Sequence, residues 1–399
     1  MVRETMKNTA EEDKLGLYIH IPFCRSKCDY CDFYSLAGRE SRMDDYQRAL
    51  LAHLRASADA ARGVPVDTVY FGGGTPSFYG AGRLSELLAA VRDLYTVEED
   101  AEITAEANPD SADGESLEDL RKAGFSRISL GMQSADPEEL RRVHRPHTVL
   151  QTLEAVTAAR RAGFWNLSLD LICGLPGQTE ESWRRTVETA LKLGPEHLSC
   201  YGLIVEPGTP LSARAVKGEK LPEDDLLADL YIWTVERLER AGLAQYEISN
   251  FAKPGCASRH NMRYWLMRPY LGFGPGAHSD FGGRRWSYAR DLDGYIRDAL
   301  TGGARPEEEK TIPLRERAEE YLMLRLRTVR GVDAEEYSRM YRLDFRPLES
   351  RFTEFREQGW AARTPEGRWR FTPKGFLVSN ELIAELLLEQ EKTGEVPAK

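Results

Sequence analysis

The stretch Leu17-Tyr-Ile-His-Ile-Pro-Phe-Cys-Arg-Ser-Lys-Cys-Asp-Tyr-Cys-Asp-Phe33 decides how this chain is interpreted, because it joins an apolar run to three closely spaced cysteines. Cys24, Cys28 and Cys31 are half of the six cysteines and fall within eight residues. Soft thiolates at this density favour an iron–sulfur cluster. Three thiolates leave one iron of a [4Fe–4S] cubane open to an external ligand, such as the amino and carboxylate groups of S-adenosylmethionine. An electron passed from the cluster into the sulfonium would give an adenosyl radical.

Two other interpretations of the cysteines stay open at this point. The spacing i, i+4, i+7 also lines one face of a helix, where cysteine packs as a small apolar residue. Pro22 and the polar residues between the cysteines instead favour a loop that leaves a strand. A structural zinc ion needs four ligands, and no nearby cysteine completes the set. His20 could complete it, but it belongs to the predicted strand.

The composition is that of an ordinary globular protein of 399 residues, with 41% hydrophobic and 30% charged residues. This length is enough for one large α/β domain and a smaller one. The net charge of −10 argues against nucleic-acid binding. Cys173, Cys200 and Cys256 are scattered and indicate no disulfide framework, and cluster-binding thiolates require a reducing compartment.

The sequence carries no targeting signal that we can identify. Residues 1–14 are polar and charged and lack the apolar core of a secretory signal. No segment approaches the roughly 20 apolar residues of a membrane span. We therefore expect a cytoplasmic protein, in transient contact with a membrane at most.

Short apolar runs alternate with amphipathic helical stretches along the first half of the chain, which predicts repeated βα units and a parallel sheet. The predicted strands are Leu17–Ile21, Thr68–Phe71, Glu102–Glu106, Arg127–Gly131, Asn166–Ile172 and His197–Leu203. The predicted helices are 43–61, 80–95, 114–123, 149–162 and 180–193. Six units are fewer than the eight of a closed barrel, so we expect an α/β fold with a partial, TIM-like (β/α)6 barrel. Chemistry in such barrels lies at the C-terminal ends of the strands, and the cysteine loop follows the first strand.

After about residue 210 the pattern changes to a smaller, mostly helical part. A helix at 223–241 precedes an aromatic-rich stretch, 245–290, that we expect to be irregular, and Thr301–Pro306 has the composition of a linker. Helices at 314–328, 333–340 and 346–357, a hairpin within Gly359–Gly375 and a last helix predict a winged-helix-like domain. Acidic residues are plentiful there, so we expect it to pack or to bind a partner rather than DNA.

A glycine loop, Gly72-Gly-Gly-Thr-Pro76, directly follows the second predicted strand. Glycines let backbone groups approach a small polar ligand closely, although glycine-rich turns after strands are common. The loop lacks the Gly-Lys-Ser/Thr ending of a phosphate loop. Beside a three-cysteine cluster, it is expected to cradle the methionyl amino group.

Four polar side chains fall at predicted strand ends or just beyond them, namely Glu106, Gln133, Arg145 and Asp170. Asp170 interrupts an apolar strand, and a buried carboxylate needs a partner. Ribose hydroxyls, a sulfonium or a structural arginine would each serve. Singly, each residue is equally well explained as a cap or a surface group. Together, at one edge of the sheet, the four predict a nucleoside pocket.

A second informative segment is Tyr246-Glu-Ile-Ser-Asn-Phe-Ala-Lys-Pro-Gly-Cys-Ala-Ser-Arg-His-Asn-Met-Arg-Tyr-Trp265, followed by Leu271-Gly-Phe-Gly-Pro-Gly-Ala-His-Ser279. A histidine such as His260, beside the aromatic rings of Tyr264 and Trp265, can bind a porphyrin iron through its imidazole. A hydrogen-bonded histidine in an aromatic core is the more common situation. Cys256 is another candidate ligand. His144 and His147 are expected in a loop near the adenosine site, without a metal role.

Three motifs together resemble radical SAM proteins of the oxygen-independent coproporphyrinogen III oxidase type. They are Cys24-x-x-x-Cys28-x-x-Cys31, the Gly-Gly-Gly-Thr-Pro loop, and Asp170-Leu-Ile-Cys-Gly-Leu-Pro-Gly-Gln-Thr179. Within that type, His260-Asn-x-x-Tyr-Trp265 is similar to the heme-chaperone branch, HemW. The likeness runs from about residue 15 to residue 380, nearly the whole chain.

The resemblance implies a domain organisation and a set of ligand-binding residues. The implied parts are a polar tail (1–14), a radical SAM core barrel (15–245), a heme-associated segment (246–300) and a C-terminal HemN/HemW-like domain (307–399). S-adenosylmethionine contacts are implied for Tyr18, Gly73, Gly74, Thr75, Glu106, Gln133, Arg145 and Asp170, with Tyr30 at the adenine. Heme binding is implied for His260, Asn261, Tyr264 and Trp265. The implied cofactors are thus a [4Fe–4S] cluster, S-adenosylmethionine and heme.

Two departures from the true oxidase favour the chaperone. The oxidase type carries a fourth cysteine two residues after the third, and Phe33 stands there in this chain. The oxidase type also has a longer N-terminal segment before its first strand. The expected function is therefore heme delivery to acceptors such as respiratory enzymes, without oxidase activity. The resemblance further implies exchange between monomer and homodimer. Oxidative decarboxylation of coproporphyrinogen III to protoporphyrinogen IX is the alternative.

Overall fold

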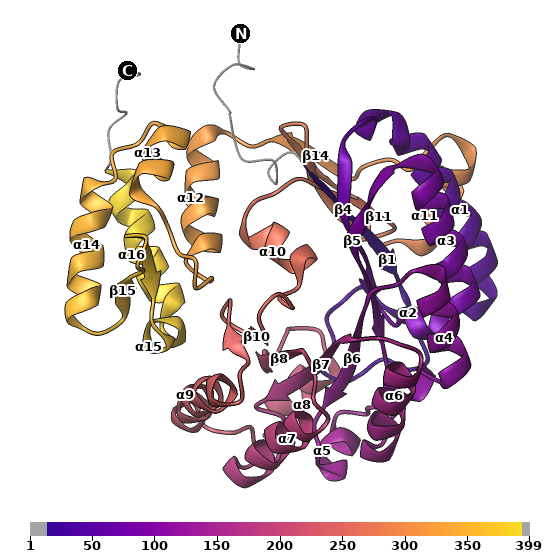
Figure 1. The fold of residues 1–399 in the computed structure, drawn as a ribbon, viewed down its shortest axis with the longest axis horizontal. Coiled ribbons are helices and arrows are strands. Elements are labelled where there is room, and N and C mark those ends of the chain that lie inside the picture. Colours follow the sequence, from indigo (N-terminus) through magenta and orange to yellow (C-terminus); the bar gives the residue numbers. More distant parts are fainter. Residues whose placement is uncertain (1–13, 393–399) are drawn as a thin grey trace. The chain divides into compact units, whose positions relative to one another are not determined.

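A computed structural model describes residues 14–392, which form two compact units (Figure 1). The first unit runs to Leu227 and resumes over Arg268–Lys310. The second comprises Ala228–Met267 and the chain from Thr311 onward. The segment 246–300, expected to be one functional region, is therefore divided between the two units. The predicted linker Thr301–Pro306 lies inside the first unit, between helix α11 (Leu292–Thr301) and strand β14 (Glu308–Thr311).

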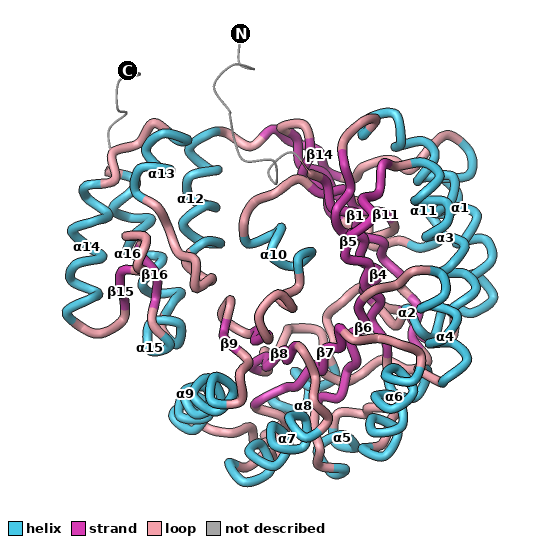
Figure 2. The backbone as a smooth tube through the Cα atoms, viewed as in Figure 1, coloured by secondary structure: helices cyan, strands magenta, loops and turns pink. Residues whose placement is uncertain are grey.

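The first unit is built on a sheet that begins, at one edge, with β14, β13 (Arg284–Ser287), β12 (His278–Phe281) and β11 (Tyr270–Phe273). The sheet continues with β1, β4, β5, β6, β7 and β8 (Figure 2). The six predicted strands are all present and mutually parallel. They are β1 (Leu15–Ile21), β4 (Pro65–Gly73), β5 (Thr96–Ala107), β6 (Arg127–Gln133), β7 (Asn166–Cys173) and β8 (His197–Gly202). The open, parallel α/β architecture predicted from the sequence is thus confirmed.

Helices follow the strands as the sequence predicts and cover one face of the sheet (Figure 1). They are α1 (Met43–Ser57), α3 (Ala81–Leu94), α4 (Gly114–Ala123), α6 (Val149–Arg161) and α7 (Glu180–Lys192). Every residue of β6 is buried, as expected for a central strand of a parallel sheet. The C-terminal ends of these strands lie at one edge of the sheet, which brings the polar residues after each strand into one region.

The prediction of an irregular 245–290 stretch was wrong, because much of it extends the sheet. Strand β11 (Tyr270–Phe273) pairs in parallel with β1, and β12 (His278–Phe281) and β13 (Arg284–Ser287) continue in antiparallel order. The sheet is therefore wider than the six predicted strands. These strands have four residues each, too few to show a clear pattern. A Cβ atom at Gly272 would lie 2.1 Å from the carbonyl oxygen of His278, so glycine permits this close pairing.

The second unit is mostly helical and has its own core. Its elements include α9 (Asp224–Arg240, which begins in the first unit), β9 (Ala244–Gln245), β10 (Asn250–Ala252), α10 (Arg259–Trp265), α12 (Leu314–Arg325), α13 (Ala334–Tyr341), α14 (Arg346–Glu357), the hairpin β15 (Ala361–Arg363) and β16 (Trp369–Phe371), α15 (Pro373–Leu377) and α16 (Ser379–Glu391). The predicted helices and hairpin are confirmed. Aromatic rings such as Tyr337, Phe352 and Trp369 fill the core. Among residues 14–392, no helix is both long and apolar enough to cross a bilayer.

Candidate functional site

The cysteine loop leaves β1, and its two ends are held together as a short two-stranded ribbon. Strand β2 (Phe23–Cys24) pairs in parallel with β3 (Leu36–Ala37), and none of the three cysteines lies in a helix. The helical interpretation of their spacing was therefore wrong. The glycine loop after β4 supports this ribbon, because Gly74 donates its N–H to the Ile21 carbonyl (2.8 Å) and Thr75 to the Phe23 carbonyl (2.8 Å). The two motifs found in the sequence are thus one structural unit.

Each of the three cysteine sulfurs has a polar side-chain partner. The Thr75 hydroxyl donates to Cys24 Sγ (3.4 Å), and Arg145 Nη1 donates to Cys28 Sγ (3.3 Å). Cys31 Sγ lies 3.9 Å from the Ser35 hydroxyl. Such donors stabilise negative charge on sulfur and orient metal ligands. They come from three different loops, so the fold fixes all three sulfurs.

The electrostatics of the loop favour metal ligation over free thiolates. Burial raises the pKa of Cys24 and Cys31, and the neighbouring cysteines raise both further. Without a cation, these groups are held as thiols. Bound iron would reverse this, because a coordinating thiol loses its proton to the metal.

The number of thiols fits a cluster. Three cysteines are the donor set of a cubane that keeps one iron open, because each thiolate binds a different iron. A structural zinc ion requires four protein ligands, and this loop supplies three.

The glycine loop has backbone geometry that only glycine accommodates. Gly73 has φ +113°, and a Cβ atom there would lie 2.4 Å from the His20 ring. His20 is itself engaged at both nitrogens, through Nδ1 to the Tyr18 hydroxyl (3.0 Å) and through Nε2 to the Tyr34 carbonyl (2.8 Å). Burial lowers the pKa of His20 to about 4. His20 is thus a structural support and does not supply the fourth ligand of a zinc site.

Glu106 closes the glycine loop from the end of β5. Its carboxylate accepts a hydrogen bond from the Tyr70 hydroxyl (2.7 Å) and one from the Gly73 N–H (3.1 Å). Burial raises the pKa of Glu106 to about 7, although these two hydrogen bonds oppose the shift. A half-buried carboxylate beside a glycine loop suits a cationic ligand group, which would favour its ionised form.

Asp170 lies in the middle of β7 and is surrounded by serine hydroxyls from three strands. Ser199 donates to it at 2.7 Å, Ser129 at 3.1 Å and Ser168 at 3.4 Å. Burial raises its pKa against these hydrogen bonds. The Asp170 carboxylate thus has three serine hydroxyls as partners, and sequence reasoning missed them. The serines alternate with apolar residues, so only strand pairing shows that they meet one carboxylate.

Arg145 connects the cysteine loop to two further strand ends. Besides Cys28, its guanidinium donates through Nη2 to Asn108 Oδ1 (2.7 Å) and to the Gly131 carbonyl (3.0 Å). Asn108 also donates to the Thr75 hydroxyl (3.3 Å), a bridging role that the sequence did not indicate. Gln133 ends β6 with φ 62°, a left-handed conformation that turns the chain at this edge.

Tyr30 lies against a small apolar cluster formed by Val143, Ile172, Leu175 and Leu203. Burial raises the pKa of its hydroxyl group, which keeps the side chain neutral. We call these five residues the apolar wall. A flat, neutral surface of this kind can pack against an aromatic base. The wall joins the cysteine loop to the chain segments after β7, β8 and helix α5 (Pro137–Arg142).

The remaining histidines near this region have structural partners. His144 Nδ1 pairs with Asp29 (2.8 Å), a cysteine-loop carboxylate that also binds Arg214. His147 Nε2 lies 3.2 Å from the Met132 carbonyl. Both side chains are thus held by groups of the protein itself.

The predicted heme segment forms helix α10 in the second unit. Ser258 caps this helix by accepting the Asn261 N–H (3.3 Å), and Trp265 ends it. His260 is 1% exposed, and its Nε2 lies 2.9 Å from the hydroxyl of Tyr264, one turn along the helix. The two rings meet edge to face, at 5.3 Å between centroids. Cys256, the alternative ligand, is also buried.

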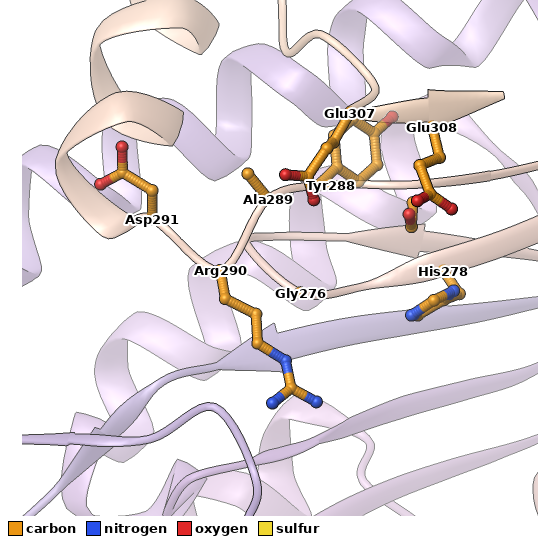
Figure 3. A pocket seen from close by; sticks show the side chains of 9 residues that line it. Gly276, His278, Tyr288, Ala289, Arg290, Asp291, Glu307 and Glu308 are labelled. Carbon is orange, nitrogen blue, oxygen red and sulfur yellow. The ribbon is translucent and has the colours of Figure 1, made fainter.

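A cavity of about 540 Å³ lies beside the cysteine loop in the first unit (Figure 3). His278, Arg290 and Glu308 line it, together with the turn at Gly276. Arg290 Nη1 is 3.9 Å from Asp32, the residue after Cys31. The lining has charges of both signs.

Comparisons with known proteins agree with this geometry. Residues 18–190 match the radical SAM superfamily, and residues 312–378 match the HemN C-terminal domain. A protein named heme chaperone HemW from Bacillus subtilis is 35% identical, with 93% of this chain and 99% of that protein covered. Its namesake from Mycobacterium tuberculosis is 41% identical over 73% of this chain and 75% of its own length. The solved structure of coproporphyrinogen III oxidase (HemN) from Escherichia coli, described as a radical SAM enzyme, superposes with a TM-score of 0.82 at 25% identity, covering 94% of this chain and 90% of that one.

Proposed function

The chain belongs to the HemW family of the radical SAM superfamily, and from this premise we propose that it is a heme chaperone. It binds a [4Fe–4S] cluster, S-adenosylmethionine and heme, and it delivers heme to acceptor proteins. The observation that carries the proposal is the likeness over nearly the full length of both chains, which includes the cysteine loop and helix α10. The proposal for each ligand has its own structural support.

The cluster would be held by Cys24, Cys28 and Cys31, with Thr75, Arg145 and Ser35 as hydrogen-bond partners of the sulfurs. When bound, a three-thiolate cluster supplies an open iron and an electron for S-adenosylmethionine. Arg145 places its positive charge against Cys28, where it offsets the negative charge of a thiolate-bound cluster.

Different residues around the cysteine loop would contact different parts of the S-adenosylmethionine molecule. Gly73 and Glu106 suit the methionyl amino group, because the loop has no side chains and the carboxylate favours a cation. Asp170 suits the ribose hydroxyls. The apolar wall that contains Tyr30 suits the adenine. Tyr18, Gly74, Thr75, Gln133 and Arg145 line or support the same strand ends.

Heme would be bound at helix α10 through His260, Asn261, Tyr264 and Trp265. His260 offers a nitrogen donor that heme iron accepts, and the rings of Tyr264 and Trp265 offer flat surfaces. The hydrogen bond between His260 and Tyr264 means that ligation by Nε2 requires Tyr264 to move. The acceptors would include respiratory enzymes, reached from the cytoplasm with transient membrane contact, and the chaperone would exchange between monomer and homodimer.

Coproporphyrinogen III oxidase activity is the competing function, favoured by the fold shared with HemN. Phe33 argues against it. This residue occupies the place of the oxidase's fourth cysteine, and its side chain is 70% exposed. A large exposed apolar side chain cannot perform the chemistry of a thiol at that place.

The test begins with anaerobic reconstitution of the full chain, iron counting and titration with heme, monitored by the Soret band. The loaded protein is then mixed with an apo-acceptor hemoprotein, and heme transfer is followed by the acceptor's spectrum. In parallel, the protein is incubated with coproporphyrinogen III, reductant and S-adenosylmethionine. The proposal predicts heme binding, transfer and no protoporphyrinogen. Turnover of the porphyrinogen, or the absence of a Soret change, would refute it.

A further inference from the structure

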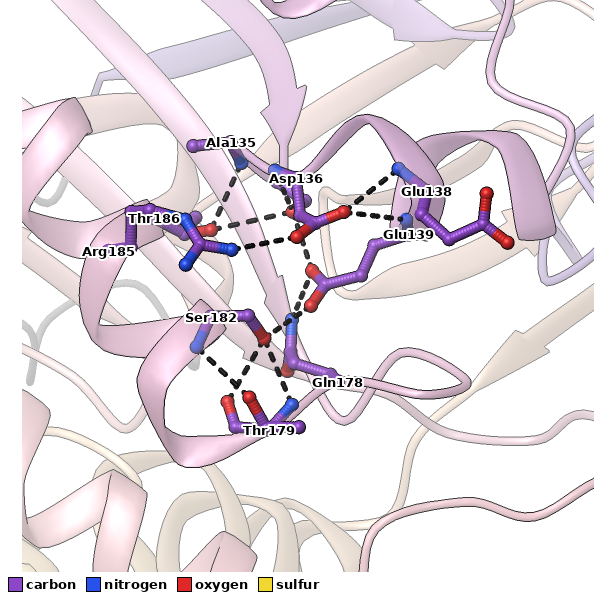
Figure 4. A network of polar contacts seen from close by, with 10 residues as sticks. Ala135, Asp136, Glu138, Glu139, Gln178, Thr179, Ser182, Arg185 and Thr186 are labelled. Carbon is purple, nitrogen blue, oxygen red and sulfur yellow. Dashed lines mark hydrogen bonds and ion pairs between the residues drawn. The ribbon is translucent and has the colours of Figure 1, made fainter.

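Behind the apolar wall, the first unit contains a closed network of buried polar groups around Glu139 (Figure 4). Glu139 lies in α5 and is 3% exposed. Its carboxylate accepts hydrogen bonds from Ser134 (2.5 Å), Ser182 (2.5 Å) and the side-chain amide of Gln178 (3.0 Å). A carboxylate this deeply buried is costly unless every acceptor site is occupied. Here the donors come from the turn after β6, from α7 and from the turn after β7.

Gln178 carries the network into the turn after β7. Its side-chain oxygen accepts the N–H of Gly174 (2.6 Å), and its amide nitrogen also donates to the carbonyl of Ile172 (3.2 Å). Its own backbone N–H donates to the carbonyl of Leu175 (2.9 Å). Gln178 therefore fixes the backbone between Ile172 and Leu175, which are two residues of the apolar wall.

Helix α5 fixes the other half of the wall. Val143 follows α5 directly, and its carbonyl accepts the N–H of Asp29 (3.2 Å) in the cysteine loop. The N–H of Arg145 is bonded to the carbonyl of Leu140, one residue after Glu139. A Cβ atom at Gly177 would lie 2.2 Å from the Arg142 guanidinium, so α5 and the turn after β7 are in direct contact. A shift of α5 would move Val143 and Arg145 together.

From this geometry we infer that Glu139 and Gln178 are positioning residues for the nucleoside half of S-adenosylmethionine. They hold Val143, Ile172 and Leu175 against Tyr30 and thereby set the shape of the adenine surface. Neither side chain touches the ligand. This inference rests on the proposed binding of S-adenosylmethionine, and it predicts which half of that molecule loses affinity when the network is broken.

The inference makes different predictions for different replacements. Glu139→Ala removes the carboxylate that three buried donors share, and a buried donor that loses its acceptor costs on the order of a tenfold change in an equilibrium constant. Glu139→Gln keeps a side-chain oxygen for Gln178 and Ser134, and its amide can donate to Ser182 after the hydroxyl rotates. Glutamine should therefore restore most of what alanine loses. Gln178→Ala should cause the same defect as Glu139→Ala, because it removes the other member of the hydrogen-bonded pair.

Glu138 provides a matched control on the same helix. Its side chain is half exposed and bonds the surface arginines Arg141 and Arg142. Glu138→Ala changes the same residue type, one position away, without touching the buried network. It should leave ligand binding unchanged.

The experiment compares two sulfonium ligands on the reconstituted full-length protein. S-adenosylmethionine has both halves, whereas S-methylmethionine has the amino-acid half and no nucleoside. Cluster-based electron paramagnetic resonance measures both dissociation constants. For Glu139→Ala, the Kd for S-adenosylmethionine should rise about tenfold while the Kd for S-methylmethionine and the iron content stay constant. Glu139→Gln and Glu138→Ala should both match wild type.

The outcomes separate this inference from the proposed function. If wild type binds neither sulfonium, the proposed cofactor site fails. If wild type binds both and Glu139→Ala loses affinity for both equally, or for neither, the positioning role is wrong. If Glu139→Ala does not fold, Gln178→Ala carries the same test.

Discussion

The cysteine site of the first unit and helix α10 of the second unit differ in how their donor atoms are prepared for a ligand. Around the cysteines, polar side chains from three loops contact the sulfurs. On α10, the candidate donor nitrogen of His260 is already bonded to Tyr264. A parallel sheet positions the first site before any ligand arrives. The second is carried by a helix of seven residues and must break an existing bond. The comparison predicts a rigid cofactor site and an adaptable cargo site.

The largest expected effect comes from a substitution that disrupts the cysteine site alone. Cys28→Ser should reduce reconstituted iron from about four atoms per chain to less than about one, because a cubane needs all three protein thiolates. Heme titration of the same variant should still give a Soret change, since α10 is untouched. Cys256→Ser is the control and should keep its iron. Iron retained by Cys28→Ser would mean that the cluster does not use this loop.

A steric clash at the first site gives the next largest effect. A Cβ atom at Gly74 would lie 2.8 Å from the carbonyl oxygens of Ile21 and Phe23, which belong to the backbone and cannot turn away. Gly74→Ala should therefore lower the free energy of unfolding by about 1–3 kcal/mol. Urea denaturation measures this change.

Gly82 in α3 is the matched control for Gly74, because a Cβ atom there meets nothing within 4 Å. Gly82→Ala should leave stability equal or raise it by up to about 1 kcal/mol, since alanine favours the helix. Equal stability of both variants would show that the glycine loop is not the rigid element described here.

Two substitutions on α10 test how the hydrogen bond between His260 and Tyr264 affects heme binding. His260→Ala should weaken heme binding by about tenfold or more, whereas Tyr264→Phe should strengthen it by about fivefold, because the phenylalanine variant lacks one hydrogen bond that ligation must break. Heme titration measures both effects, and iron content should stay at the wild-type value. Weaker binding in Tyr264→Phe would instead identify the tyrosine hydroxyl as a contact of the bound heme.

The smallest effect is a pH dependence at the first site. Burial raises the pKa of Glu106 to about 7, so its carboxyl group ionises between roughly pH 6 and pH 8. A cationic ligand favours the carboxylate, and the Kd for S-adenosylmethionine should fall several-fold across this range. Glu106→Gln should show a flatter profile. An identical profile in the two proteins would remove Glu106 from the binding step.

The raised pKa of Glu106 also makes the free energy of unfolding depend on pH, and this dependence runs opposite to that of ligand binding. Because the folded pKa lies above the ordinary value of 4.5, the folded protein binds more protons than the unfolded chain between about pH 4.5 and pH 7. The contribution of Glu106 to the free energy of unfolding therefore decreases as the pH rises through this window. Glu106→Gln should lack that component in denaturation measured at several pH values.

The sequence alone determined the repeated strands and helices, the cysteine loop and the glycine loop. These features are local, because strand burial, helix periodicity and glycine conformations are set by neighbouring residues. The remaining contacts at the site depend on the order of the strands in the sheet. Only pairing in the sheet brings Ser129, Ser168 and Ser199 around Asp170, and only the fold links Asn108 to Thr75 and Arg145. Glu139 and Gln178 lie far apart in sequence among ordinary polar residues. Each is buried and needs the other as a hydrogen-bond partner, and this pairing exists only in the tertiary structure.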